Sequence, residues 1–304
     1  MKILLAVDGS AYSTWAAKTL ATFQLAPESE VTVFSVVPEH TFLGGLTLDT
    51  LSGHAAAKNR EEAKKAQEQR ANELVQSAVG VLEAAGVKAT GTVRRGKPAE
   101  EIIREADRTG ADLVVLGAKG IDDNERFALG TVAQKVVKYA GCSVLLARKR
   151  VSSLQRVLLA TDGSKYSDAT SQFLFDLALP GDCDILVVTV LQSHNIATWM
   201  KTPTLDLETT QSILADLQKA EEEAAAELVD KTTRAFRQQK YRVSSMVRKG
   251  EPADEILAAA SVLNPDLIVL GAKGLTGIER FLLGGVAQRV ARYAKHSVLV
   301  VRQR

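Results

Sequence analysis

Residues 111–120 read ADLVVLGAKG, and residues 265–274 read PDLIVLGAKG. In each stretch an unbroken apolar run ends in the same four residues, glycine, alanine, lysine and glycine. A short, continuous apolar run bounded by turn residues is typical of a parallel strand that is covered on both faces. The chain therefore carries two copies of a buried strand followed by a glycine-rich loop.

These stretches belong to a repeat with a constant offset of 154 residues. KILLAVDGSAYS, from residue 2, matches RVLLATDGSKYS, from residue 156, and VRRGKPAEEI matches VRKGEPADEI. A period this long indicates a duplicated domain rather than a solenoid of short units. We predict domains at residues 1–149 and 154–304, joined by a short polar linker around Ser152 and Ser153.

Apolar runs alternate with helical stretches within each copy. In the first copy the expected strands are 3–7, 31–37, 87–94, 113–116 and 144–147, and the long stretch 55–85 is the most extended helical candidate. This alternation predicts an α/β fold. We expect two tandem Rossmann-like, doubly wound domains, each with a five-stranded parallel sheet in the order 3-2-1-4-5.

The composition excludes several classes of protein. The 304 residues are 46% hydrophobic and 24% charged, and the formal charge of +2 gives no general attraction to nucleic acid or to an anionic membrane. Cys142 and Cys183 lie in separate halves, outside any metal-binding or redox motif. The first apolar run is too short for a signal peptide, and no run approaches the ~20 residues of a membrane span. We expect a cytoplasmic protein.

A ligand of a doubly wound domain binds beyond the carboxyl ends of the strands, between strands 1 and 4. Asp8 ends the first strand, and the loop GAKGIDDNERFALGT begins at Gly117, where the fourth strand ends. Its glycines permit close approach of the backbone to a ligand, and Gly130-Thr131 opens a helix whose free amides suit a phosphate. A carboxylate at Asp8 suits a ribose hydroxyl or a divalent cation that bridges phosphates.

Other nucleotide and catalytic motifs are missing. The sequence has no G-x-x-x-x-G-K-[ST] loop, and VDGSAYS stands where G-x-G-x-x-G would follow the first strand. It has no H-x-G-H element, and no G-x-S-x-G elbow or Ser/His/Asp set indicates acyl transfer. The glycine loop is therefore the feature that points to a ligand.

The motif AVDGSAYS, the G-x-x-G-x9-G-[ST] loop and the closing CSVLLAR resemble the universal stress protein family, and the two halves together look like a tandem member. The resemblance implies the ATP-binding branch, with ATP (or AMP or ADP) as ligand and Mg²⁺ reaching Asp8 through the nucleotide. It implies ribose, phosphate or metal contacts for Asp8, adenine contact for the backbone of Val36, and ribose and phosphate contacts for Gly117, Gly120, Gly130, Thr131 and Val132. The second-copy counterparts are Asp162, Val190, Gly271, Gly274, Gly284, Gly285 and Val286.

The second copy departs from the pattern at Gly285, which occupies the position of the serine or threonine in the G-x-x-G-x9-G-[ST] motif. Losing a hydrogen bond to a charged group costs about 1.5–3 kcal/mol. Our hypothesis is a full ATP site in the first copy and a weaker site, or one for fewer phosphates, in the second.

Each of these residues also has a purely structural interpretation. Asp8 with Ser10, and Asp162 with Ser164, could simply cap the first helix of each copy. The glycines could serve only to form a tight turn between strand and helix. Lys119 and Lys273, inside the G-x-x-G, and Arg126 and Arg280 further along either screen phosphate charge or are solvated surface side chains.

The resemblance implies a nucleotide-responsive regulator or protectant under stress. A slow ATPase or phosphoryl-transfer enzyme is an alternative, although the chain offers no obvious base to activate water. A nucleotide-independent interaction module that uses the long segments 38–54 and 192–211 is another. The resemblance also implies an intramolecular pseudo-dimer, with the domains paired through SVLLAR and SVLVVR, and allows a further homodimer.

Overall fold

The structure is a computed structural model, and it describes residues 1–39, 42–43, 46–47, 54–121, 128–192, 207–274 and 283–303. The elements of the first copy are β1 (Lys2–Ala6), α1 (Ala11–Leu20), β2 (Glu30–Pro38), β3 (Phe42–Leu43), β4 (Leu46–Thr47), α2 (His54–Glu83), β5 (Ala89–Gly96), α3 (Pro98–Thr109), β6 (Leu113–Gly117), α4 (Thr131–Tyr139) and β7 (Ser143–Ala147). Those of the second are β8 (Arg156–Ala160), α5 (Lys165–Leu177), β9 (Asp184–Leu191), α7 (Leu207–Gln238), β10 (Arg242–Lys249), α8 (Pro252–Leu263), β11 (Leu267–Gly271), α9 (Gly285–Tyr293) and β12 (Ser297–Val301).

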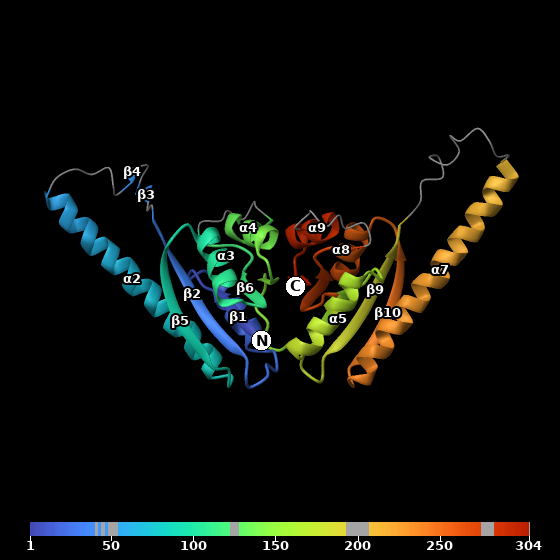
Figure 1. The fold of residues 1–304 in the computed structure, drawn as a ribbon, viewed down its shortest axis with the longest axis horizontal. Helices are drawn as coiled ribbons and strands as arrows, with labels where there is room; N and C mark the ends of the chain where they lie inside the picture. Colours follow the sequence, from blue (N-terminus) through green and yellow to red (C-terminus); the bar gives the residue numbers. More distant parts are fainter. Residues whose placement is uncertain are drawn as a thin grey trace.

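The predicted strand order is confirmed in both copies. The parallel strands run β5-β2-β1-β6-β7 in the first copy and β10-β9-β8-β11-β12 in the second, which is the order 3-2-1-4-5 twice. The last strands of the two copies then pair antiparallel, with Leu145 opposite Leu299. The two five-stranded sheets therefore continue into one mixed sheet of ten strands, with the copies side by side (Figure 1).

Successive strand residues point to opposite faces of the sheet, and each face carries its own hydrophobic core. Ile3 and Leu5 of β1 belong to the core on the face covered by α1 and α2 and, in the second copy, by α5 and α7. Leu4 and Ala6 belong to the core on the opposite face, which α3 and α4, and α8 and α9 in the second copy, cover. Both cores contain residues of both copies, so the apolar interior runs across the join.

Some expectations need correction. The edge strand expected at 87–94 is β5 (Ala89–Gly96), which is only partly buried and so is not covered on both faces. Its counterpart β10 is also largely exposed, with Val247 at 40% of its full accessible area. Ser152 and Ser153 are exposed as expected of a linker, but Val151 and Leu154 beside them are buried in the core. Of the long segment after strand 2, residues 42–43 and 46–47 of the first copy pair as two short antiparallel strands, and α7 of the second copy begins at residue 207. The rest of these segments, 40–41, 44–45, 48–53 and 193–206, lies outside the described residues. The helices α2 and α7 lie along the outer flanks and extend past the sheet (Figure 1).

Candidate functional site

The predicted site residues lie at the carboxyl edge of the sheet, where the strand order reverses. The chain leaves β1 towards β2 on one side, while β6 pairs with β1 on the other, with Ala6 opposite Leu116. Asp8 follows β1 and Gly117 ends β6, so adjacent strands bring the aspartate and the glycine loop together. The same pairing of β8 with β11 places Asp162 beside Gly271.

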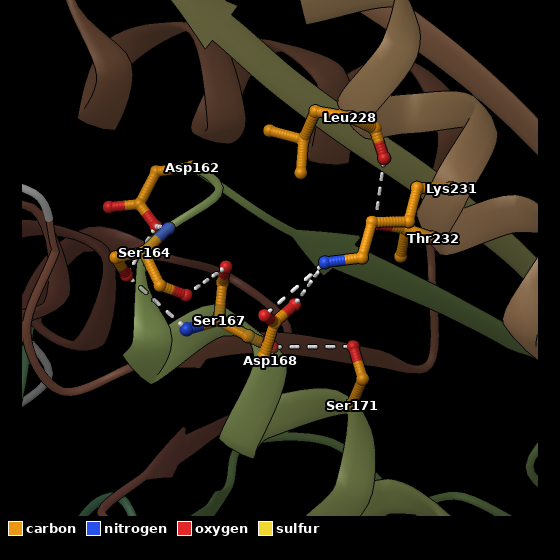
Figure 2. Close-up of polar contacts among 8 residues, drawn as sticks. All are labelled: Asp162, Ser164, Ser167, Asp168, Ser171, Leu228, Lys231 and Thr232. Atoms are coloured by element: carbon orange, nitrogen blue, oxygen red, sulfur yellow. Dashed lines mark hydrogen bonds and ion pairs between the residues drawn. The ribbon is translucent and has the colours of Figure 1, made fainter.

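The aspartate holds a turn, and the serine two residues later caps the helix. Asp8 Oδ1 accepts from the Ser10 amide at 2.9 Å, and Ser10 Oγ accepts from the Ser13 amide at 3.1 Å, at the start of α1. Figure 2 shows the second copy, where Asp162 Oδ1 accepts from the amide and hydroxyl of Ser164 at 3.0 and 2.7 Å. The capping interpretation is therefore right for the serines and wrong for the aspartates.

The first glycine of the loop is required by the protein itself. A Cβ on Gly117 would lie 2.7 Å from Tyr12 Cβ and 2.8 Å from the Tyr12 carbonyl carbon, so the start of α1 packs directly on the end of β6. A Cβ on Gly271 would likewise lie 3.0 Å from the Lys273 carbonyl oxygen. These two glycines have a packing role, whatever they contact in a ligand.

The next glycine lies against the aspartate. A Cβ on Gly274 would overlap Asp162 Oδ2, so the backbone of the second-copy loop runs immediately beside that carboxylate. Lys273, between the two glycines, places its ammonium 5.8 Å from the centre of the Tyr166 ring. In the first copy the Lys119 carbonyl oxygen accepts from the Ser10 hydroxyl at 3.4 Å, which ties the same part of the loop to α1.

The two ends of each loop are joined by hydrogen bonds. The Gly130 amide donates to the Ala118 carbonyl at 2.8 Å, and the Gly284 amide donates to Ala272 at 2.7 Å. Gly130 and Gly284 therefore use their amides within the loop. Residues 122–127 and 275–282, which include Arg126 and Arg280, lie outside the described residues.

The helices that follow the loops begin without a side-chain cap. The N-caps of α4 and α9 are Gly130 and Gly284, neither of which makes a capping side-chain bond, in contrast to the serine caps of α1 and α5. The first intrahelical bond of α4 comes from the Gln134 amide, so the amides of the first turn have no helical acceptor. Such a turn, starting at Thr131 and Val132, is suited to bind an anion.

A cavity of about 1020 Å³ occupies this edge in the second copy. Apart from Arg280, which lies outside the described residues, it is lined by the second-copy residues that the sequence predicts: Asp162, Val190, Gly271, Lys273, Gly274, Gly284, Gly285 and Val286. Gly285 is exposed, and a Cβ built there has no atom within 4 Å, so the missing side chain leaves open space.

Sequence reasoning missed the contribution of α7 to the cavity. Ala225 and Leu228 form part of its wall, and Glu227 and Lys231 stand at the same side. Lys231 Nζ lies 3.4 Å from Asp168 Oδ2 of α5 (Figure 2). The sequence carries a partial signal, because Leu74 and Leu228 are equivalent at the repeat offset of 154 residues. In the structure Leu74 lies against Gly9 and Leu228 against Gly163. Asp168 and Lys231 themselves have no charged counterparts at the repeat offset, where threonine and serine stand.

The first copy carries the same residue types at the equivalent positions, apart from Thr131 in place of Gly285. Val36 lies near the end of β2, and Asp8, Gly117, Lys119, Gly120, Gly130, Thr131 and Val132 occupy positions equivalent to the residues around the second-copy cavity. Thr131 is exposed at the first position of α4.

The side chains of the described residues offer little support for a metal site or a reactive thiol. Within the described ranges no three side chains of histidine, cysteine, aspartate or glutamate gather as a metal site would require. Both cysteines are free and buried, and burial raises the pKa of the Cys183 thiol to about 12, so this thiol stays protonated at neutral pH. Any cation at Asp8 would therefore need ligands from a bound molecule.

Fold and site together define a tandem, doubly wound α/β protein that presents an aspartate, a glycine loop and an uncapped helix at each switch point. The chain belongs to the universal stress protein family, whose family model matches residues 1–148 and again 153–302.

Individual relatives agree with this placement. A universal stress protein of Mycolicibacterium smegmatis is 28% identical over 99% of this chain and 97% of its own length. One of Methanocaldococcus jannaschii is 30% identical over 49% of this chain and 82% of its own length. The crystal structure of a universal stress protein from Archaeoglobus fulgidus has a TM-score of 0.61 at 22% identity, covering 99% of this chain and 96% of that one. Among the described helices, none combines the length and the apolar character that crossing a membrane requires.

Proposed function

We propose that this universal stress protein binds adenine nucleotide at the carboxyl edge of the sheet, with ATP in the first copy, and acts as a nucleotide-responsive regulator or protectant under stress. One observation carries the proposal. The aspartate, the glycine loop and the uncapped helix, chosen from the sequence alone, surround a single cavity in the second copy.

Each part of that site has a chemical task in the proposal. Asp8 holds the ribose, or a Mg²⁺ ion bound to the phosphates, and the strand end at Val36 faces the adenine. The first-turn amides of α4, at Thr131 and Val132, receive the phosphates, because unpaired amides and the helix dipole both favour an anion. The Thr131 hydroxyl adds a further donor.

The second copy differs at this last position. Gly285 supplies no hydroxyl, so we expect its site to hold the phosphates less firmly. The wall that α7 adds, with Ala225 and Leu228, offers apolar surface suited to a base.

The antiparallel pairing of β7 with β12 supports a pseudo-dimer of the two copies within one chain. A homodimer of whole chains remains part of the proposal, to be measured by light scattering. The free, buried cysteines fit a reducing cytoplasm.

Calorimetric titration with ATP tests the proposal, after any copurified nucleotide has been released by heat and identified by chromatography. We expect binding with a stoichiometry of at least one, lost from the first copy in the double variant Gly130→Val and Thr131→Ala. Lys135→Ala, an exposed change on the next turn of α4, is the matched control and retains binding. Repeating the titration in the presence of a chelator shows how much of the ATP affinity depends on Mg²⁺. The absence of binding to the folded protein would overturn the proposal.

A further inference from the structure

Two arginines cross the join between the copies. Arg148 follows β7 and Arg302 follows β12, and they are equivalent in the repeat. The Arg148 amide donates to Ser297 Oγ at 3.2 Å, and the Arg302 amide donates to Ser143 Oγ at 3.2 Å. Each arginine is thereby anchored on the last strand of the other copy.

The guanidinium group of Arg148 contacts both copies at once. Its Nη1 donates to the Ala128 carbonyl at 2.6 Å, two residues before the N-cap of α4. Its Nη2 donates to the carbonyls of Ala291 and Arg292, in the last turn of α9. One planar group thus joins the loop end of the first site to the helix that begins at the second.

Arg302 makes the reciprocal contact. Its Nη2 donates to the Val137 carbonyl at 2.7 Å and to the Lys138 carbonyl at 3.3 Å, in the last turn of α4. Each nine-residue helix therefore has one end in its own candidate site and the other end held by the arginine of the other copy.

These contacts suit arginine for physical reasons. The last carbonyls of a helix lack helical donors and carry the negative end of its dipole, so a cation stabilises them. Burial lowers the pKa of Arg148 to about 10, which leaves the group charged at neutral pH. The rigid fork places separate nitrogens on separate acceptors, which the single ammonium of a lysine cannot do.

We propose that Arg148 and Arg302 are positioning residues that couple the two sites, so that nucleotide in one copy changes the affinity of the other. The inference rests on the proposed nucleotide function. A ligand on the loop and first turn of α4 fixes the backbone at Ala128, and with it the guanidinium group of Arg148. That group sets the position of α9, whose opposite end presents the amides of Gly285 and Val286. Coupling of this kind is reciprocal between the two sites.

The test confines ATP to the first copy and observes the second. Gly274→Val places a side chain where Asp162 Oδ2 lies, which blocks the second site. In this background, hydrogen exchange is followed by mass spectrometry with and without ATP. We expect slower exchange in peptides covering 128–134 and also in peptides covering 285–293, by about fivefold or more in the latter.

Variants at position 148 then distinguish coupling between the two sites from a purely structural role of the arginine. In Arg148→Met the slowing at 128–134 should persist, while the slowing at 285–293 is lost. Arg148→Lys keeps the charge at the join, and therefore tests the fork even if the methionine variant fails to fold; it should lose the distant slowing as well. Arg150→Met, which removes an exposed arginine two residues further along, is the matched control and should keep both effects.

The outcomes distinguish the two proposals. Slowing at 128–134 without any at 285–293 would overturn the coupling and leave nucleotide binding intact. Distant slowing that survives in both Arg148 variants would overturn the role of the arginine. No ATP effect on the first copy would overturn the proposed function, and this inference with it.

Discussion

Gly285→Thr is the sharpest test of how the two copies differ. Gly285 is the first residue of α9, it is exposed, and a Cβ built there meets no atom within 4 Å. A threonine side chain therefore enters open space at the phosphate end of the cavity. It would stand where Thr131 stands on α4 of the first copy.

The size of the effect follows from the hydrogen bond that the new hydroxyl would donate. A hydrogen bond to a charged group contributes about 1.5–3 kcal/mol. This corresponds to a gain of about tenfold to about a hundredfold in ATP affinity at the second site. AMP, which carries one phosphate and less negative charge than ATP, should gain less.

Calorimetry measures this gain once the first site is silenced by Gly130→Val with Thr131→Ala. Gly285→Val is the matched control, because valine has the shape of threonine without its hydroxyl. Equal affinity for ATP in the threonine and glycine proteins would refute the argument, as would an equal gain with valine. Thr131→Val in the otherwise unchanged first copy should lose affinity by the same factor.

Three further predictions concern single sites. Gly274→Val should abolish nucleotide binding in the second copy, because the valine side chain displaces Asp162 Oδ2, and it should lower the melting temperature only slightly. Binding retained in calorimetry would contradict this prediction. The hydrogen bond from Arg108 lowers the pKa of Glu105, so its stabilisation is complete above about pH 4.5 and is lost as pH falls through the lowered value. Glu105→Gln should therefore lower the free energy of unfolding in urea at pH 7 and have progressively less effect in acid, and a cost independent of pH would count against it. Burial lowers the pKa of His296 below 6.5, so the unfolded chain takes up the proton first and stability falls below pH 6.5; His296→Gln should flatten this decline.

Much of the fold could be predicted because strand register and strand order follow from patterns that occur twice. The repeat offset pairs each strand with its counterpart, and uninterrupted apolar runs such as 113–116 mark the central strands to within about two residues. The burial of the edge strand β5, expected at 87–94, was misjudged, because a strand with a neighbour on one side only need not bury both faces.

The candidate site was only partly accessible from the sequence. Its glycines and aspartate could be identified, but a glycine looks the same whether a ligand or a helix requires it. Gly117 is crowded by Tyr12, which no pattern in the loop reveals. The acceptors of Arg148 are backbone carbonyls, which every residue possesses, so the crossing contact leaves no signature in the residues that it touches.

The copies share the backbone frame of the candidate site and differ in side chains at the wall of the cavity. Gly9 and Gly163 both take positive φ, Ser10 and Ser164 cap equivalent helices, and the loop ends close through equivalent hydrogen bonds. The substitution at Gly285, in contrast, lies on the cavity wall.

The second change also involves a residue of the cavity wall, Lys231. The pair of Lys231 with Asp168 joins α7 to α5 beside Asp162, and it is exposed enough to contribute little to stability. Because the backbone frame is kept while one side chain is lost at the phosphate end and charges are gained at the cavity wall, we expect both copies to bind nucleotide in the same place. We therefore expect them to differ in which part of the nucleotide they hold most firmly: the phosphates in the first copy, the nucleoside in the second.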